Sequence, residues 1–187
     1  PNIAILGAGI SGMGAAQLAY VLGIPAFLSD AKALSEKDKK QLNQWGIDYE
    51  ENGHNVGRLN DAAAVIKSPG IPHTAPIIKA LKSEGSVILG EVDWAAHYTT
   101  AKLIGVTGSN GKTTTATLCH HIMAAEMDAV LAGNIGQSLA GALANRMQNT
   151  EPDPEVVILE LSSFQLDDVF ELKLDQGILT NITPDHL

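Results

Sequence analysis

The sequence predicts an α/β protein with two units, each built on a mostly parallel β-sheet. Short apolar runs of strand length alternate with longer segments of helical character, which is the pattern of βαβ units. Each half opens with a strand that ends in a glycine-rich turn, first at residues 7–12 and again at residues 105–113. Aromatic residues make up only 4% of the chain while glycines number 18, a balance that suits tight turns in an α/β protein and not a β-sandwich.

In the first half, strands are predicted at residues 3–6, 26–29, 63–67 and 86–89, and helices at residues 11–22, 35–45 and 75–84. Ser11 is the expected N-cap of the first helix, and Ser35 with Asp38 has the spacing of a capping box. The segment 68–72 has two prolines around a glycine and cannot continue a helix or a central strand. We expect it to form a loop at the carboxyl edge of the sheet.

In the second half, strands are predicted at residues 102–106, 129–132, 156–161 and 177–182, and helices at residues 112–125 and 137–147. We place the boundary near residues 97–101, which gives domains 1–97 and 98–187. About four strands are few for a doubly wound sheet around a phosphate loop. The second domain is therefore expected to be truncated, and the chain to be a fragment of a longer protein.

The amino-acid composition excludes several classes of binding partner and covalent cross-link. Lys and Arg number 12 against 21 Asp and Glu, and a net charge of -9 argues against binding to a nucleic-acid backbone. Cys119 is the single cysteine, which excludes an internal disulfide and a multi-cysteine zinc site and suits a reducing cytoplasm. No charge precedes Asp30, yet glycines and Pro25 interrupt that stretch well short of the ~18 residues of a membrane-spanning helix. We expect a cytoplasmic protein with no nucleic-acid or membrane partner.

The first glycine loop, Gly7-x-Gly9-x-x-Gly12, follows a strand and opens a helix, and Asp30 ends the next strand. This context is that of a Rossmann-like dinucleotide fingerprint, in which glycines allow a pyrophosphate to approach the backbone at a helix N-terminus. Asp30 would then face a ribose or a base. The alternative is a glycine turn that serves only helix–strand packing, and the loop does not settle which nucleotide binds.

The second glycine loop predicts a P-loop-type ATP-binding domain. It departs from strict Walker A spacing, because Val106 stands five positions before Gly111. Even so, the N–H groups of residues 108–113 can cradle anionic oxygens, Lys112 can neutralise the β- and γ-phosphates, and the Thr113 hydroxyl can coordinate magnesium. The alternative, an ordinary anion-tolerant helix start, would not need the lysine.

Acidic and imidazole side chains follow the later strands. Glu160 ends an apolar strand, where its carboxylate would reach toward the phosphate loop and hold magnesium; the alternative is a capped, solvent-facing strand end. His186 follows the last strand and could face the same edge, or be a hydrogen-bonded loop residue. We expect His54, His73 and His97 to be surface or loop residues. His120 and His121 are adjacent on a predicted helix and face different ways, so we do not expect them to share a metal. Cys119 is expected to be a small buried hydrophobic residue.

Several segments together resemble one family. GVTGSNGKTTT resembles the ATP loop of the Mur ligases, the ATP-dependent amide ligases of peptidoglycan precursor synthesis, and LELSSFQLD, NITPDHL, SPGIP and AGNIG extend the similarity over essentially the whole chain. The P-loop alone would not separate these enzymes from folylpolyglutamate synthases. SSFQL and the first glycine loop narrow the resemblance to the member that joins D-glutamate to UDP-N-acetylmuramoyl-L-alanine.

The resemblance implies a three-domain enzyme, of which this chain holds the first domain and part of the second. It implies ATP and Mg²⁺ as cofactors, and UDP-N-acetylmuramoyl-L-alanine and D-glutamate as substrates. The substrate carboxylate would attack the γ-phosphate to give an acyl phosphate, from which the amine of D-glutamate displaces phosphate. The modified lysine of the family and the third domain would lie beyond residue 187. We expect the fragment alone to be inactive, and a monomer.

The resemblance also implies site residues. The UDP-substrate would contact Gly7, Gly9, Ile10, Ser11, Gly12, Asp30, Lys32, Ser68, Gly70, Asn134, Ser162 and Gln165. ATP would contact Gly108, Ser109, Asn110, Gly111, Lys112, Thr113 and Thr114. The metal ligands would be Thr113, Glu160 and His186, and the catalytic residues Lys112 and His186. After Asp30 the family often has Thr and Arg, whereas this chain has Ala31 and Lys32.

Three other functions stay open at this point. One is a different Mur-type amino-acid ligase. Another is an NAD-dependent dehydrogenase or NAD-sensing regulatory module, which the first loop alone favours and in which the Gly-Lys-Thr loop has no role. The third, for this chain itself, is a non-catalytic binding fragment.

Overall fold

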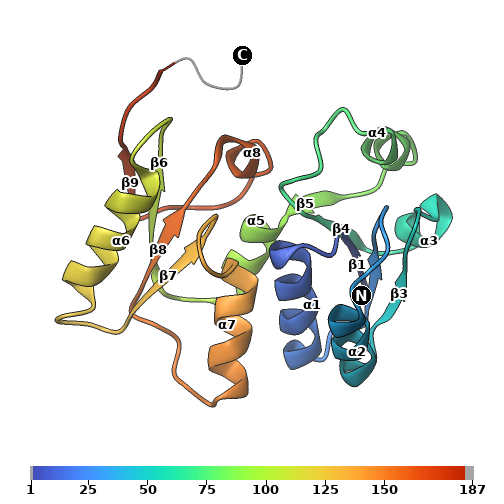
Figure 1. Ribbon diagram of the computed structural model, residues 1–187, viewed down its shortest axis with the longest axis horizontal. Coiled ribbons are helices and arrows are strands. Elements are labelled where there is room, and N and C mark those ends of the chain that lie inside the picture. The colour runs from blue at the N-terminus through green and yellow to red at the C-terminus, as the bar shows by residue number, and fades with distance from the viewer. Residues whose placement is uncertain (1, 184–187) are drawn as a thin grey trace.

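The computed structural model describes residues 2–183 and contains two parallel β-sheets that lie side by side (Figure 1). The five-stranded first sheet has the order β3-β2-β1-β4-β5, with β1 at Ile3–Leu6, β2 at Ala26–Ser29, β3 at Asp48–Glu50, β4 at Ala64–Lys67 and β5 at Ile88–Gly90. The four-stranded second sheet has the order β7-β8-β6-β9, with β6 at Lys102–Thr107, β7 at Ala129–Gly133, β8 at Val156–Glu160 and β9 at Gln176–Leu179. Every pairing is parallel, so the predicted α/β class is confirmed.

Helices connect the strands, as parallel pairing requires. In the first half they are α1 (Ile10–Leu22), α2 (Glu36–Trp45), α3 (Val56–Asn60) and α4 (Pro76–Ser83). Residues 91–98 form α5 (Glu91–Ala95) and a 3₁₀ turn, η1 (Ala96–Tyr98), between the two sheets. The second half has α6 (Lys112–Met123), α7 (Leu139–Gln148) and α8 (Ser163–Leu166). No helix among the described residues is long and apolar enough to cross a membrane.

Helix ends follow local chemistry, with one correction to the sequence interpretation. Gly23 and Gly46 end α1 and α2 in the left-handed conformation, with φ of 67° and 66°, which glycine adopts without a Cβ penalty. Ser35 caps α2 as predicted, because its side chain accepts from the N–H of Asp38. Ser11 was expected to cap α1, and this is wrong: the helix begins at Ile10 and Gly9 is its N-cap. Ser11 therefore lies inside the first helical turn.

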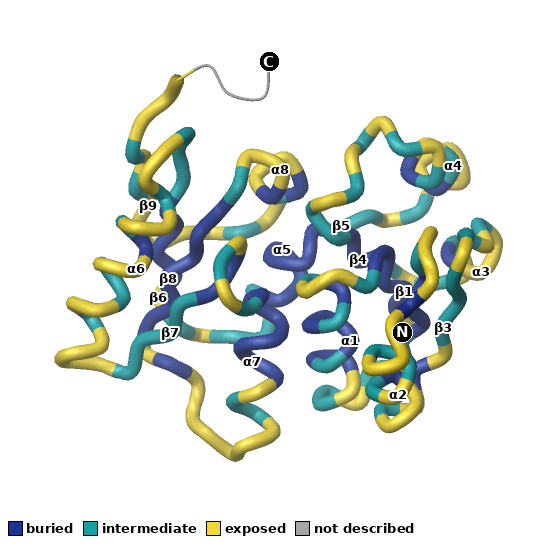
Figure 2. The backbone as a smooth tube through the Cα atoms, viewed as in Figure 1, coloured by how far each residue is buried: buried dark blue, intermediate teal, exposed yellow. Residues whose placement is uncertain are grey.

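A single apolar core joins the two sheets through α1 and α7, which pack against each other (Figures 1 and 2). Leu18 of α1 and Leu143 of α7 both belong to this core and are buried. The helices approach closely at Gly14: a Cβ there would lie 2.1 Å from Ser138 Oγ and 2.9 Å from Gly141 N. Because a side chain would not fit, glycine at this crossing lets the two domains share one packed interior.

Buried polar contacts also link the sheets. Glu91, which is 2% exposed, accepts a hydrogen bond from the N–H of Ala140 in the first turn of α7, at 2.6 Å. The carboxylate of Asp93 in α5 accepts from three consecutive N–H groups of the segment after α8, residues 170–172. These contacts tie the segment between the sheets to α7 and to the segment that follows α8.

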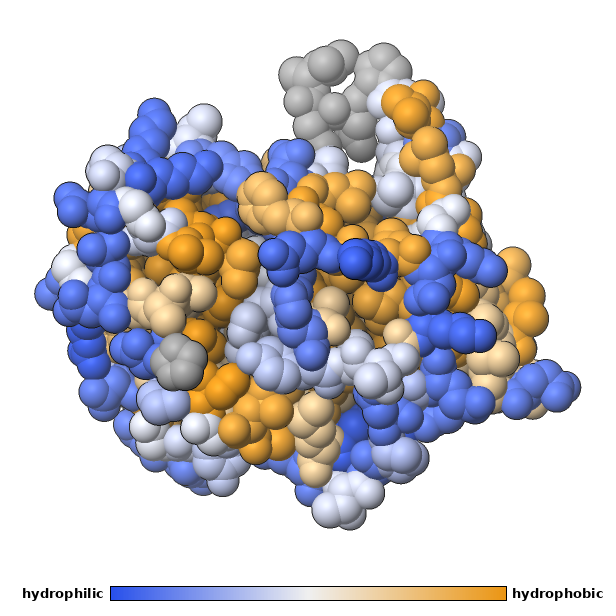
Figure 3. Space-filling model, turned by 180° about the vertical axis from the view of Figure 1, so that it is seen from behind, coloured by the Kyte–Doolittle hydropathy of each residue, from blue (hydrophilic) through white to orange (hydrophobic). Residues whose placement is uncertain are grey.

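The second sheet is the less enclosed of the two within the described part of the chain. Leu118 and Ile122 of α6 and Leu179 of β9 are 56%, 60% and 58% exposed. Figure 3 shows hydrophobic surface along the edge of the molecule that carries these elements. In contrast, β1 and β8 are buried along their whole length.

Candidate functional site

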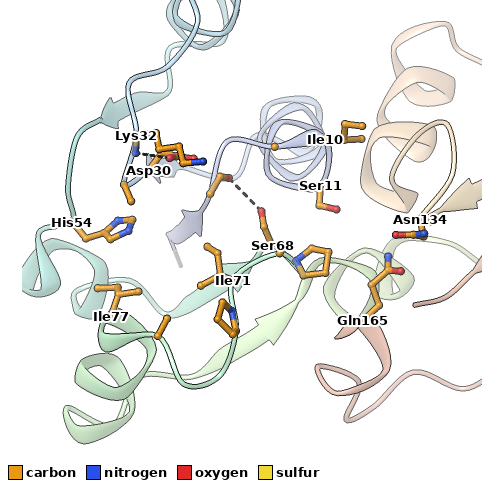
Figure 4. Close-up of a pocket in the computed structure, with 18 of the residues that line it drawn as sticks. Ile10, Ser11, Asp30, Lys32, His54, Ser68, Ile71, Ile77, Asn134 and Gln165 are labelled. Atoms are coloured by element: carbon orange, nitrogen blue, oxygen red, sulfur yellow. Dashed lines mark hydrogen bonds between the residues drawn. The ribbon is translucent and has the colours of Figure 1, made fainter. Parts of the chain in front are cut away.

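Two neighbouring cavities lie at the carboxyl edges of the sheets, the position at which open α/β sheets bind ligands. The first, of about 720 Å³, is lined by the loops that follow β1, β2 and β4 and by Asn134 and Gln165 of the second domain (Figure 4). The second, of about 560 Å³, lies over the loop between β6 and α6. Pro69, Gly70 and Asn134 line both cavities. The two sites are therefore adjacent and share a wall.

The first glycine loop has the geometry that a phosphate-binding turn requires. Gly7 has φ of 95°, and a Cβ at Gly12 would lie 1.8 Å from Gly7 O, so both positions need glycine. Nothing lies within 4 Å of where a Cβ of Gly9 would stand. The start of α1 thus presents open backbone N–H groups and the positive end of the helix dipole to the cavity. Gly12 itself packs against the loop and does not line the cavity.

Asp30 connects two loops around the first cavity. Its Oδ2 accepts from the N–H of Ala8 at 2.6 Å, and its Oδ1 accepts from the N–H of Lys32 at 2.8 Å. Each carboxylate oxygen already has a backbone donor, so Asp30 fixes the shape of the cavity wall. Direct contact between Asp30 and a base stays a prediction.

The loop 68–72 is held from below by Lys67, whose side chain is buried. Lys67 Nζ donates to Ile71 O at 2.7 Å and to Ser68 O at 3.3 Å. Ser68 Oγ lies 3.4 Å from Gly7 O, a long hydrogen bond that joins this loop to the first glycine loop. Gly70 is exposed on the cavity side, with open space around it.

The loop between β6 and α6 forms the floor of the second cavity. Gly108 and Gly111 have φ of 132° and 83°, and a Cβ at Gly108 would lie 2.2 Å from Thr180 Oγ1. Lys112 Nζ donates to Gly108 O at 2.6 Å and to Ser109 O at 3.0 Å, so its ammonium lies over the loop. A lysine ammonium held over a glycine-rich turn at the start of a helix is an arrangement that suits polyphosphate, since the lysine and the helix N-terminus both favour negative charge.

Glu160 receives two side-chain donors at the carboxyl end of β8. Its Oε2 accepts from Thr113 Oγ1 at 2.8 Å and its Oε1 from Asn134 Nδ2 at 2.9 Å. Glu160 is 2% exposed, so the alternative of a solvent-facing strand end is wrong. A carboxylate beside a hydroxyl is a set of hard oxygen ligands that suits Mg²⁺. The described residues contain no group of three or more His, Cys, Asp or Glu side chains that could hold a metal ion.

The segment SSFQL carries a capping box at α8. Gln165 Oε1 accepts from the N–H of Ser162 at 2.9 Å, and Ser162 Oγ accepts from the N–H of Gln165 at 3.2 Å. The two residues face different cavities: Ser162 lines the second and Gln165 the first. A four-residue helix thus contributes to both sites.

The structure gathers most of the predicted residues around the two cavities. The first is lined by ten of them: Gly7, Gly9, Ile10, Ser11, Asp30, Lys32, Ser68, Gly70, Asn134 and Gln165. The second is lined by Gly70, Gly108, Ser109, Lys112, Asn134 and Ser162. Four predicted ATP contacts belong to the same loop and helix start but do not line it: Asn110, Gly111, Thr113 and Thr114. His186 lies outside the described residues.

Sequence reasoning missed several residues at the two sites. His54 lies in the loop between β3 and α3, as expected, but its half-buried side chain also lines the first cavity together with Ile71 and Ile77. Asn181 Oδ1 accepts from the N–H of Asn110 at 3.0 Å, and Ser109 Oγ donates to Thr183 O at 2.9 Å. The polar side chains of the NITPDHL segment are the sequence signal for these last contacts.

Two parallel α/β sheets with a glycine loop at each carboxyl edge define a protein with two adjoining sites of nucleotide-binding type. Comparison with known families agrees with this description. The Mur ligase middle domain family matches residues 106–187, and the MurD N-terminal domain family matches residues 2–76. The chain belongs to the Mur ligases, in the family of the UDP-N-acetylmuramoylalanine–D-glutamate ligases.

Individual relatives cover the whole chain. It is 47% identical over 187 residues to the UDP-N-acetylmuramoylalanine–D-glutamate ligase of Bacteroides fragilis and 48% identical to that of Bacteroides thetaiotaomicron. The match covers 100% of this chain and 41% of each relative, so the chain spans about two fifths of their length. Among solved structures, a UDP-N-acetylmuramate:L-alanyl-γ-D-glutamyl-meso-diaminopimelate ligase from Neisseria meningitidis shares the fold, with a TM-score of 0.64 and 20% identity over 99% of this chain and 61% of that one.

Proposed function

We propose that the protein carrying this chain is an ATP-dependent amide ligase that adds D-glutamate to UDP-N-acetylmuramoyl-L-alanine in the cytoplasm. The observation that carries the proposal is the shared wall of the two cavities, in which Asn134 faces both. A ligase of this kind must bring a substrate carboxylate to the γ-phosphate of ATP, and two adjoining sites do this. The names of the relatives support the choice of substrates.

The first cavity suggests the direction in which the UDP-substrate lies. Ile71 and Ile77 form an apolar end suited to a base, and the N-terminus of α1 lies between this end and the second domain (Figure 4). Asn134 and Gln165 line the opposite end, beside the second cavity. The pyrophosphate would lie over α1, and the acyl end would extend toward Lys112.

The second cavity supplies the groups that ATP-dependent activation needs. Lys112 would bind the β- and γ-phosphates, while Thr113 and Glu160, whose side-chain oxygens are in contact, would hold Mg²⁺. When bound, Mg²⁺ neutralises phosphate oxygens and so lowers the barrier to phosphoryl transfer. Ser162 and Asn134 line this cavity, where they can orient the substrate carboxylate.

The chemistry that this arrangement supports has two steps. A carboxylate oxygen of the L-alanyl group attacks the γ-phosphorus, the bond to the bridging oxygen breaks, and ADP leaves with the acyl phosphate formed. The amine of D-glutamate then attacks the acyl carbon and loses a proton, and inorganic phosphate leaves with the amide formed. Lys112 stabilises the negative charge that develops on the phosphoryl oxygens in the first step.

The test is phosphate release by the full-length protein with ATP, Mg²⁺, UDP-N-acetylmuramoyl-L-alanine and D-glutamate. We expect release to require D-glutamate and not L-glutamate, and to be lost in Lys112→Met. Release that does not depend on D-glutamate would contradict the assignment. Calorimetric titration provides a second measurement: tighter binding of NADH than of UDP would favour the dehydrogenase alternative instead. Sedimentation of the same sample would test the expected monomer.

A further inference from the structure

His54 stands at the apolar end of the first cavity and belongs to a chain of side-chain hydrogen bonds behind the cavity wall. Its Nδ1 lies 2.7 Å from Ser29 Oγ. Ser29 ends β2, is fully buried, and donates from Oγ to Glu50 Oε1 at 2.6 Å. The same Glu50 oxygen accepts from the N–H of Asn55 at 2.7 Å. The chain thus runs from Glu50 through Ser29 to His54.

This chain determines which nitrogen of His54 carries the proton. An ionised carboxylate only accepts hydrogen bonds, so the single hydroxyl proton of Ser29 points to Glu50. The oxygen of Ser29 must then accept from His54, and Nδ1 is the donor. In the neutral ring Nε2 therefore carries a lone pair, and it is the acceptor.

The acceptor nitrogen is available to a ligand. None of the hydrogen bonds among the described residues involves Nε2, and Figure 4 shows the ring projecting into the cavity from the wall that it shares with Lys32. The other polar side chains at this end, Asp30 and Lys32, do not offer a free acceptor. Both oxygens of Asp30 have backbone donors, and the ammonium of Lys32 can only donate.

A nucleoside has donors that match this acceptor. Uracil presents one N–H, at N3, and the ribose presents hydroxyl groups, while Ile71 and Ile77 provide apolar surface for the faces of the base. We propose that His54 Nε2 accepts a hydrogen bond from the uracil N3–H or the ribose 2′-hydroxyl of the UDP-substrate, which makes His54 a specificity-determining residue. Glu50 and Ser29 are positioning residues that fix its tautomer. This inference rests on the proposed function, because it takes a uridine nucleotide as the ligand.

The experiment measures dissociation constants by calorimetry for UMP, 3-methyl-UMP and 2′-deoxy-UMP. The informative variant is His54→Asn, because the Asn amide can still donate to Ser29 but has no group in the place of Nε2. We expect His54→Asn to bind UMP about fivefold to tenfold more weakly, which is the effect of one hydrogen bond. In the wild type one of the two modified nucleotides should bind weaker by a similar factor, and in His54→Asn that difference should disappear. Which modified nucleotide is affected identifies the donor.

Two further variants keep the result interpretable. His121→Asn makes the same substitution on α6, outside both cavities, and should bind all three nucleotides as the wild type does. Ser29→Ala removes the partner that fixes the tautomer, and should reduce the discrimination while leaving His54 in place. It also tests the inference if His54→Asn fails to fold.

The two possible failures are distinguishable. For each modified nucleotide, the ratio of its dissociation constant to that of UMP is compared between the two proteins. If these ratios are the same in His54→Asn as in the wild type, the role of His54 is overturned but the proposed function is not. No binding of UMP to the wild-type protein would overturn the proposed function, and this inference with it.

Discussion

Lys67 and Asp168 form a buried ion pair between the two domains, with Nζ and Oδ2 2.7 Å apart and side chains that are 2% and 4% exposed. Asp168 Oδ2 has no hydrogen bond of good geometry, so the attraction between the two charges holds this contact. His73 Nε2 approaches the other oxygen of Asp168 at 3.1 Å. Since Lys67 also holds the loop 68–72 and Asp168 lies two residues after the end of α8, the pair fixes the walls of both cavities relative to each other.

Removing one member of this pair should be costly, because it leaves the other charge buried without its partner. We expect Asp168→Asn to lower the free energy of unfolding by about 3 kcal/mol, measured by urea denaturation. Asp48→Asn is the matched control, because the pair between Asp48 and Arg58 is exposed and worth about 1 kcal/mol or less. Equal losses in the two variants would contradict a stabilising role for the buried pair.

A double variant separates the charge from the packing. Lys67→Met with Asp168→Leu removes both charges and keeps apolar volume at the junction. We expect it to recover much of the stability that Asp168→Asn loses, since replacing a buried ion pair by apolar groups is often neutral. If the double variant is less stable than Asp168→Asn, the hydrogen bonds from Lys67 to the loop 68–72 matter more than the charges.

Glu91 gives stability a predictable pH dependence. Burial raises the pKa of Glu91 from 4.5 to about 7, against the opposing effects of hydrogen bonds from Ala140 and Ser11. The folded state therefore holds a proton that the unfolded state releases between pH 4.5 and 7. This contribution is fully present below pH 4.5 and is lost as pH rises through 7.

Glu91→Gln should remove that dependence. We expect the variant to gain stability relative to the wild type as pH rises from 5 to 8, by roughly 3 kcal/mol at most. The measurement is urea unfolding of both proteins across this range. Glu126→Gln, at an exposed position, should show a constant difference from the wild type. A constant difference for Glu91→Gln as well would show that burying its charge costs nothing.

Gly14→Ala should force α1 and α7 apart. The new Cβ would overlap Ser138 Oγ and crowd the backbone of Gly141, so we expect a loss of about 1–3 kcal/mol in unfolding free energy. Gly57→Ala is the control, because the nearest atom to its Cβ would be 3.5 Å away. In α3 this change should be neutral or stabilising by up to about 1 kcal/mol, as alanine is the better helix former.

Thr113 provides a sharp test of the metal site. Thr113→Val removes the hydroxyl that contacts Glu160, and we expect Mg²⁺-dependent ligation by the full-length protein to fall by about 100-fold or more. Thr113→Ser keeps the hydroxyl and should retain most of the activity. Equal activity in the Val and Ser variants would show that the hydroxyl takes no part in holding the metal.

Much of the fold follows from local sequence. The strand β1 is a continuous apolar run that ends at Gly7, β2 has three apolar residues before Ser29 and ends at Asp30, and the predicted limits of both match the structure. The short elements β3 and α3 were not predicted, because three to five residues are too few to show a period. The domain limits 1–97 and 98–187 stay a prediction, since helical segments continue from one sheet toward the other.

The sites were predictable where the chemistry is local to one turn. Lys112 and Thr113 are found from the loop that contains them, and Glu160 from the end of its strand. His54 could not be found this way, because its role depends on Ser29 and Glu50, which the sheet brings to it. The hydrogen bond from the N–H of Ala140 in α7 to Glu91 could not be predicted either, because the two elements meet only in the folded core.

The packing of α1 on α7 fixes the distance between the two cavities. Since one continuous interior joins the domains, the distance from the base end of the first cavity to the ammonium of Lys112 is set by the fold before any ligand arrives. A ligand anchored by its nucleotide can reach the phosphate loop only if the part beyond its pyrophosphate has the right length. The protein can thus select a ligand by its length without any side chain that contacts the part being measured.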